Sequence, residues 1–396
     1  MQNLDTYIQS LSEKNSAPEL LARYNSFDIP HKKMEDWKFR DTKDWFQGTY
    51  NFSPASVLTS RDVEEGIANI SYDALLVYEN GIYKPDFSQA QQIQRKDREY
   101  SSETDFVNKL EVANEMCAQD GARIHISSSA SLQHILIASF YSGKETCVFQ
   151  KNSVYVESGS QIAITEIHIS LSNSVRVNHA LSIHTEEQSS CEYTTVHSLD
   201  DEVQFIQHVR VQQKAESNAT YATFPVSGKY IRTWVQVDKN GEHAHTHLNG
   251  LFFPVHEEQC EQYIYVNHLS PSCETYKLYK GLARDSGLGV FSGKVYVARD
   301  AQQTNAVQTN KNILLSDTAK IHSKPQLEIY ADDVSCSHGS TTGQIDKDAV
   351  WYMQSRGISY SEAIQLLLSG FINEVVNTVS VESVRERIRT AIVRKL

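Results

Sequence analysis

The chain has 396 residues and carries 37 basic against 49 acidic side chains, which gives a formal net charge of −12. This length allows a large buried core and two or three substructures. The acidic balance, without a basic stripe, disfavours nucleic acid and anionic membrane surfaces as partners. The N-terminus lacks the basic and apolar segments of a signal peptide, and no later stretch approaches the roughly 20 apolar residues of a membrane span.

Cysteine usage indicates the redox compartment. The six cysteines are scattered over more than half of the chain and include no C-x-x-C pair: Cys117, Cys147, Cys191, Cys260, Cys273 and Cys336. A secreted disulfide framework would be denser and more regular. We therefore expect free thiols and a reducing, cytoplasmic setting.

Residues 1–120 predict a helical and mixed region. Leu4, Ile8 and Leu11 stand at helical spacing, and Ser16 before Pro18 is typical of a cap and first turn of a second short helix. Residues 73–83 predict a hairpin about an Asn-Gly turn, and residues 106–118 predict a further helix. The aromatic residues of segment 30–39 are expected to dock on the body of the protein.

From residue 121 to residue 343 the pattern indicates strands alone. Short alternating apolar runs, separated by Ser, Asn, Gly and Glu, occupy residues 154–156, 161–164, 167–169, 175–177, 181–183, 203–205, 231–237, 295–297, 313–315 and 327–330. More than 200 residues of such strands is long for one β-sandwich. The polar and glycine residues that separate the strands recur too regularly for an α/β fold. The pattern favours a β-solenoid, in which each coil stacks on its neighbour and buries a continuous apolar ladder.

Residues 344–396 return to helical periodicity. Helices are predicted over 346–356, from a Ser359–Glu362 capping box to about Asn377, and over 381–395. Apolar residues of the second helix cover more than the roughly 100° stripe that packing on one surface requires. We therefore expect a partner protein to bind one face of it, and the candidate partner-binding residues are Ile364, Leu368, Phe371, Ile372 and Val375.

Cys336 and His338 are the candidate metal-binding residues. They stand two apart on a predicted strand, where side chains at i and i+2 share a face, and Gly339 is expected to end that strand. A thiolate and a neutral imidazole can both bind iron, zinc or an iron–sulfur cluster, yet two ligands fall short of the usual four. The alternative, favoured on residue types alone, is a partly buried cysteine beside a hydrogen-bonded histidine.

A second histidine group is His243, His245 and His247, again with period two. Three imidazoles on one strand face could bind a divalent ion, but a row of surface histidines is the favoured interpretation. The glycine-rich segment near Gly287 lacks the G-K-[ST] ending of a phosphate-binding loop. This chain is therefore not expected to bind or hydrolyse ATP.

Four segments carry a family resemblance. They are P-H-K-K-M-E-D-W-K-F at 30–39, L-V-Y-E-N-G-I-Y at 76–83, N-E-M-C-A-Q-D-G at 114–121, and residues 325–343 followed by S-R-G-I at 355–358. The chain resembles the SufB/SufD family, the scaffold subunits of the SUF iron–sulfur cluster assembly machinery. SufB typically carries a glutamate-rich H-E-A sequence where this chain has S-H-G-S at 337–340, so the resemblance favours the SufD branch.

The resemblance implies a fold and a domain order. It implies a helical N-terminal region over 1–120, a right-handed parallel β-helix over 121–343 and a C-terminal helical domain over 344–396 that binds a SufC-like ATPase. It also implies a heterodimer with a SufB-like subunit. We expect a homodimer when the chain is isolated, because an unpaired β-helix face tends to pair with another chain.

The resemblance also implies a function without catalysis. His338 falls on the histidine of the family's C-x-H motif and Cys336 on its cysteine, so the two would form half of an intersubunit site for transient iron or a nascent iron–sulfur cluster. The expected role is therefore a scaffold that supports iron acquisition and cluster formation. The alternative is a β-helix carbohydrate-active enzyme, against which stands the lack of a persuasive acid pair.

Overall fold

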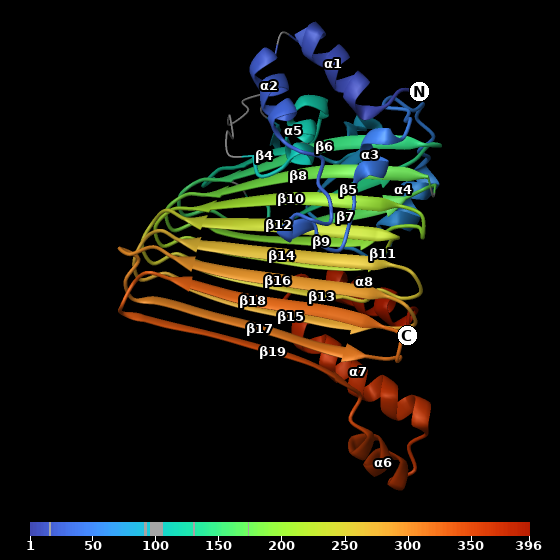
Figure 1. Ribbon diagram of the computed structural model, residues 1–396, viewed down its shortest axis with the longest axis vertical. Helices are drawn as coiled ribbons and strands as arrows, with labels where there is room; N and C mark the ends of the chain where they lie inside the picture. Colours follow the sequence, from blue (N-terminus) through green and yellow to red (C-terminus); the bar gives the residue numbers. More distant parts are fainter. Residues whose placement is uncertain (16, 91–92, 96–105, 130, 173) are drawn as a thin grey trace.

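The body of the protein is a parallel β-solenoid of about eight turns, as predicted. The computed structural model describes residues 1–15, 17–90, 93–95, 106–129, 131–172 and 174–396. Two sheets form the walls, and from β4 onwards successive strands alternate between them. Figure 1 shows the strands stacked across the view, with helices at both ends of the stack.

The two sheets have the following strands. The ten-stranded sheet has the order β19 (Val334–Gln344), β17 (Thr304–Leu314), β15 (Glu274–Ala283), β13 (His245–Phe252), β11 (Asn218–Ser227), β9 (Ser190–Ser198), β7 (Gln161–Ser170), β5 (His134–Tyr141), β1 (Ala74–Glu79) and β2 (Ile82–Tyr83). The nine-stranded sheet has the order β18 (Lys320–Ile329), β16 (Leu288–Val297), β14 (Gln259–His268), β12 (Tyr230–Lys239), β10 (Gln204–Gln213), β8 (Val175–Thr185), β6 (Thr146–Val156), β4 (Arg123–Ile126) and β3 (Gln94–Arg95).

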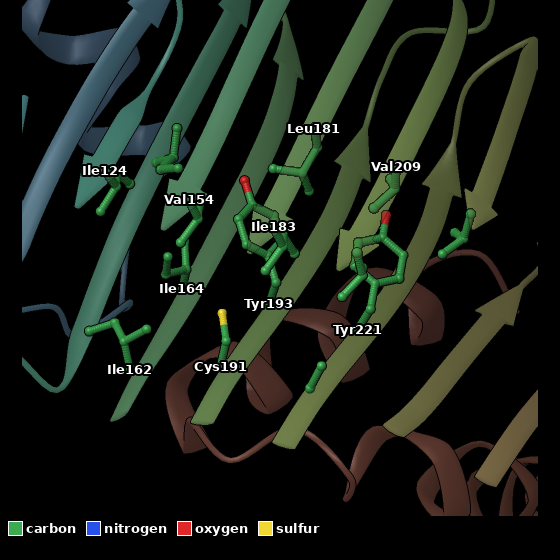
Figure 2. Close-up of a cluster of buried hydrophobic side chains, with 14 of the residues drawn as sticks. Ile124, Val154, Ile162, Ile164, Leu181, Ile183, Cys191, Tyr193, Val209 and Tyr221 are labelled. Carbon is green, nitrogen blue, oxygen red and sulfur yellow. The ribbon is translucent and has the colours of Figure 1, made fainter. Parts of the chain in front are cut away.

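Inward-facing side chains fill the solenoid as ladders. Apart from a shift between Pro225 and Ser227 where β11 pairs with β9, paired strands of the solenoid keep one register, so that a residue on one coil lies above its counterpart on the next. Aliphatic, cysteine and tyrosine side chains form much of this core: Ile162, Ile164, Leu181, Ile183, Cys191, Tyr193, Val209 and Tyr221 (Figure 2). Several coil corners place a non-glycine residue at positive φ, for example Gln188 and Glu216, which turns the chain tightly into the next strand.

Several runs that the sequence separates are single strands. Residues 161–164 and 167–169 both belong to β7, and residues 175–177 and 181–183 both belong to β8. The intervening polar residues, including Glu166 and His179, are buried inside the solenoid rather than placed in turns. These polar residues line parts of the solenoid interior. An alternating sequence pattern alone cannot distinguish such buried polar residues from loop residues.

The N-terminal helices cover the first coils. They are α1 (Leu4–Asn15), α2 (Pro18–Ser26), η1 (Glu35–Trp37), α3 (Lys43–Gln47), α4 (Ser60–Gly66), η2 (Pro85–Phe87) and α5 (Lys109–Cys117). Ser16, the predicted cap of the second helix, lies outside the described residues, and Ala17 occupies the cap position without a side-chain hydrogen bond. The predicted hairpin is present with positive φ at Asn80 and Gly81, but β1 pairs in parallel with β5. The solenoid sheet therefore begins within residues 1–120.

The C-terminal segment forms three helices, α6 (Lys347–Ser355), α7 (Tyr360–Val376) and α8 (Glu382–Val393). The predicted Ser359–Glu362 capping box is confirmed, and Gly357 turns the chain between α6 and α7 at φ +88°. Helix α7 packs against β13 and β15, and α8 packs against β11. In Figure 1, α6 projects beyond the last strand while α8 lies behind the sheet.

The predicted partner-binding residues largely face their own chain. Leu368, Ile372 and Val375 are buried in one apolar cluster with outer-face residues of the solenoid, and Ile364 and Phe371 are half-buried against it. The solenoid thus occupies much of the face that we assigned to a partner, because the outer face of this sheet is itself apolar. Among the described helices, none is both long and apolar enough to cross a membrane.

Candidate functional site

The candidate site lies where the solenoid ends. Strands β18 and β19 are the last members of the two sheets, so each has one edge without a strand partner among the described residues. Most side chains of both strands are half-exposed or fully exposed, in contrast to the buried strands of the preceding coils. The final coil thus leaves the interior of the solenoid open and presents free backbone donors and acceptors.

Cys336 and His338 both lie on β19 at inward-facing register positions. Cys336 pairs with Ala306 and His338 pairs with Gln308, both of which are buried inside the preceding coil. Residues two apart on a strand are separated by about 6.7 Å along it and share one face. The prediction that the two residues share a strand face is therefore confirmed, although β19 continues past Gly339 to Gln344 because pairing with β17 is unbroken.

The two donors differ in their surroundings. Cys336 packs in a cluster with Val295, Val297 and Leu327 and is half-buried, whereas His338 is exposed. Burial raises the pKa of the Cys336 thiol. The thiol is therefore protonated at neutral pH and would lose its proton on binding a metal.

The inward-facing residues that stack next to His338 on the two preceding coils of this sheet, Gln308 and Lys277, are polar. Gln308 accepts a hydrogen bond from Lys277 Nζ at 3.1 Å, and Lys277 also donates to the carbonyl oxygens of Ile264 and Lys294. Burial holds the pKa of Lys277 well below its usual range.

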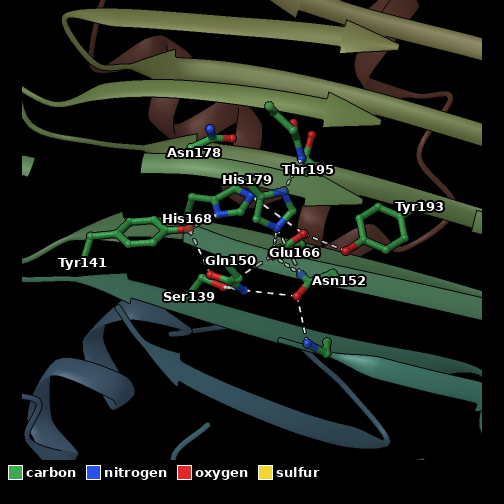
Figure 3. Close-up of polar contacts among 12 residues, drawn as sticks. Ser139, Tyr141, Gln150, Asn152, Glu166, His168, Asn178, His179, Tyr193 and Thr195 are labelled. Atoms are coloured by element: carbon green, nitrogen blue, oxygen red, sulfur yellow. Dashed lines mark hydrogen bonds and ion pairs between the residues drawn. The ribbon is translucent and has the colours of Figure 1, made fainter. Parts of the chain in front are cut away.

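Within the described residues, neither Cys336 nor His338 belongs to a group of three His, Cys, Asp or Glu donors within 4.8 Å of one another. A group of three His, Cys, Asp or Glu donors lies elsewhere, inside the solenoid: Glu166, His168 and His179 (Figure 3). The sequence carried one signal for it, the Glu-x-His spacing of period two on β7, but the contribution of β8 depends on how the coils stack.

The histidines at 243–247 do not form one face. His243 lies in a turn at φ +57°, and only His245 and His247 belong to β13. His247 stacks on Tyr276 with ring centroids 5.3 Å apart, and His245 Nδ1 lies 3.4 Å from a carboxylate oxygen of Glu274. These side chains are half-exposed or exposed on the outer face, which agrees with the surface interpretation.

Comparison with known proteins decides the family. The model of the SUF system FeS cluster assembly SufBD core domain matches residues 139–371, more than half of the chain. The chain belongs to the SufBD family. The family resemblance is thereby confirmed, and a match to a cluster-assembly family favours that interpretation over a carbohydrate-active enzyme.

Relatives of this SufBD-family protein agree. It is 34% identical over 181 residues to the "Iron-sulfur cluster assembly protein SufD" of Escherichia coli, covering 46% of this chain and 43% of the relative. It is 25% identical over 413 residues to the SufBD family protein slr0076 of Synechocystis, covering 96% and 90%. It is 28% identical over 287 residues to the chloroplastic protein ABCI7 of Arabidopsis thaliana, covering 70% and 60%. The first and third matches span less than two thirds of the relative.

Proposed function

We propose that this SufBD-family protein is a noncatalytic scaffold subunit of SUF iron–sulfur cluster assembly, of the SufD type. The observation that carries the proposal is the placement of Cys336 and His338 side by side at the open end of the solenoid. A buried pair would be structural, whereas this pair can reach a second subunit.

The pair forms half of a binding site for iron or a nascent cluster, which is the cargo of the reaction. Iron–sulfur clusters and tetrahedral metal sites take four protein ligands, and this chain offers two at the open end. A SufB-like subunit supplies the remaining ligands, so that the cluster assembles between subunits and can be released when they separate.

The subunits pair through the edges of β18 and β19. Unpaired strand edges are templates for pairing with another chain, and both edges flank Cys336. In the absence of a SufB-like subunit, the same edges pair two copies of this chain. The six free cysteines suit a reducing cytoplasm, although the Arabidopsis relative is described as chloroplastic.

A SufC-like ATPase binds at α6 and the start of α7. Trp351, Tyr352 and Tyr360 expose more than half of their side chains there, and aromatic residues are enriched at interface hot spots. ATP hydrolysis in the partner moves these helices and opens the paired β edges to iron and sulfide. We assign ATP binding to the partner rather than to this chain, because the glycine-rich segment near Gly287 leads into strand β16 rather than into a helix.

Cluster reconstitution with the SufB-like and SufC-like partners tests the proposal. His338→Ala and Cys336→Ser should each reduce the amount of iron and sulfide bound per complex, without reducing assembly of the subunits. His247→Ala is the matched control, because it removes a strand histidine from the outer face. Unchanged cluster content in both site variants would remove these residues from the site.

A further inference from the structure

Three buried donors converge inside the first half of the solenoid. Glu166 and His168 come from β7, two residues apart on its inward face, and His179 comes from β8 in the opposite sheet. Their ligand atoms all lie within 4.8 Å of one another, and no part of the three residues is exposed. Figure 3 shows the two imidazoles and the carboxylate pointing toward one another between the sheets.

Two imidazole nitrogens approach one carboxylate. His179 Nε2 lies 3.1 Å from Glu166 Oε1, and His168 Nε2 lies 3.8 Å from Glu166 Oε2. Metal–nitrogen and metal–oxygen bonds of about 2.0–2.2 Å place neighbouring ligand atoms at similar separations. A metal ion would therefore need only small side-chain movements to bind all three.

The far nitrogen of each imidazole is held by a side chain. Tyr141 OH lies 2.8 Å from His168 Nδ1, and the Gln207 side-chain amide lies 3.2 Å from His179 Nδ1. Both Nε2 atoms lie beside Glu166. His168 Nε2 has no hydrogen-bond partner, whereas His179 Nε2 also lies 3.1 Å from Asn152 Nδ2, a contact that metal binding would have to replace. Histidines that bind metals show this arrangement, in which the second nitrogen is fixed by a hydrogen bond.

The negative charge of the buried Glu166 carboxylate also favours a cation at this position. Glu166 accepts hydrogen bonds from Tyr193 OH at 2.6 Å and Asn152 Nδ2 at 2.8 Å, and within the described residues it forms no ion pair with lysine or arginine. A buried carboxylate is costly unless it is paired with a cation, and the candidates here are a metal ion or the His179 imidazole.

We propose that Glu166, His168 and His179 form an internal binding site for one divalent first-row transition ion such as Zn²⁺ or Fe²⁺. Two imidazoles and a carboxylate suit these ions, and the site contains no thiolate that would favour a cluster. Because the site is enclosed, the ion would enter as the chain folds and would join the two sheets. This site is separate from Cys336 and His338 and does not depend on the proposed assembly function.

The test uses the full chain carrying Cys336→Ser and His338→Ala, so that the open end cannot contribute. This parent is produced in cells supplied with Co²⁺, washed with EDTA to strip surface ions, and examined by elemental analysis and visible absorption. We expect about one EDTA-resistant ion per chain with ligand-field bands, since binding is coupled to folding. A metal-free chain, in which His179 and Glu166 form a plain ion pair, would overturn the proposal.

Variants assign the site. His179→Gln should abolish the retained cobalt. Tyr141→Phe, which removes the hydrogen bond to His168 Nδ1 and a long one to Gln150 Oε1, should weaken retention about 10- to 100-fold. His247→Gln should retain the ion in full, because that histidine lies on the outer face. Equal retention in His179→Gln and the parent would refute the assignment.

X-ray absorption of the parent decides the case if His179→Gln does not fold. A first shell of nitrogen and oxygen with imidazole scattering supports the site. A first shell without imidazole scattering, or no retained ion, overturns it.

Discussion

The guanidinium of Arg232 lies over the ring of Trp37, with its central carbon 3.9 Å from the ring centroid. Tyr263 flanks the same guanidinium at 3.9 Å, and Glu261 forms a buried ion pair with it. Trp37 belongs to η1 of the N-terminal region, whereas the other three residues belong to β12 and β14. One arginine therefore fastens the N-terminal segment to the middle of the solenoid, and the expected docking of segment 30–39 has a specific anchor.

Arg232→Met should destabilise the protein by roughly 3–5 kcal/mol, because it leaves the Glu261 carboxylate buried without its cation. Urea unfolding followed by tryptophan fluorescence measures the loss. Glu261→Gln in the same background should recover part of it, since the uncompensated charge disappears. A loss under about 1 kcal/mol for the single variant would show that the pair is solvated.

Stability should fall as the pH drops below about 6.5, in part because of His208. Burial, with Arg232 and Arg210 nearby, lowers the pKa of His208 to about 3 in the folded state, against roughly 6.5 in an unfolded chain. Asn108 Nδ2 lies 3.0 Å from His208 Nε2, which suits the neutral ring. The unfolded chain therefore binds the proton first, and the contribution is present above pH 6.5 and is lost between pH 6.5 and 3.

His208→Gln should flatten this dependence by up to about 1.4 kcal/mol per pH unit between pH 6 and 4.5. Unfolding free energies across that range provide the measurement. His256→Gln is the control, because the His256 side chain is exposed. Parallel pH profiles of His208→Gln and the unmodified chain would contradict the assignment.

Lys280 fastens α7 to the solenoid. Its nearly buried side chain donates to the Phe371 carbonyl oxygen at 2.7 Å and pairs with Glu374. Lys280→Met should cost about 1.5–3 kcal/mol of local stability, as expected for hydrogen bonds from a charged group, and accelerate amide exchange across 360–376. Lys311→Met should have little effect, since Lys311 is half-exposed and 3.8 Å from Glu374. Equal exchange in both variants would assign α7 docking to apolar contacts alone.

Trp351→Ser should weaken binding of a SufC-like ATPase by at least about 30-fold if Trp351 is a hot spot worth about 2 kcal/mol. Titration calorimetry with the purified ATPase measures the change. Tyr155→Ser, which removes an exposed aromatic side chain from β6, should leave the affinity unchanged. Wild-type affinity for Trp351→Ser would place the docking surface away from α6.

The open end of the solenoid shows which features of the candidate site follow from local sequence pattern. Because side chains alternate along any strand, the spacing of Cys336 and His338 predicted their common face before any coil was placed. The change to helical periodicity at residue 344 also predicted that the pair lies in the last coil. Neither pattern predicted that its face continues the Ala306 and Gln308 ladders, because that pairing depends on coil length, which no local spacing encodes.

By itself, the sequence determined the period-two solenoid, the helix cap at Ser359, and the shared face of the C-x-H pair. Each of these depends on residues a few positions apart. Only the tertiary structure decided that Leu368 packs on its own sheet and that Glu166 meets His179 across the interior. The physical reason is that coil length and corner geometry set which distant residues meet, and these coils are unequal: Gln204 pairs with Tyr230, and Leu288 pairs with Lys320.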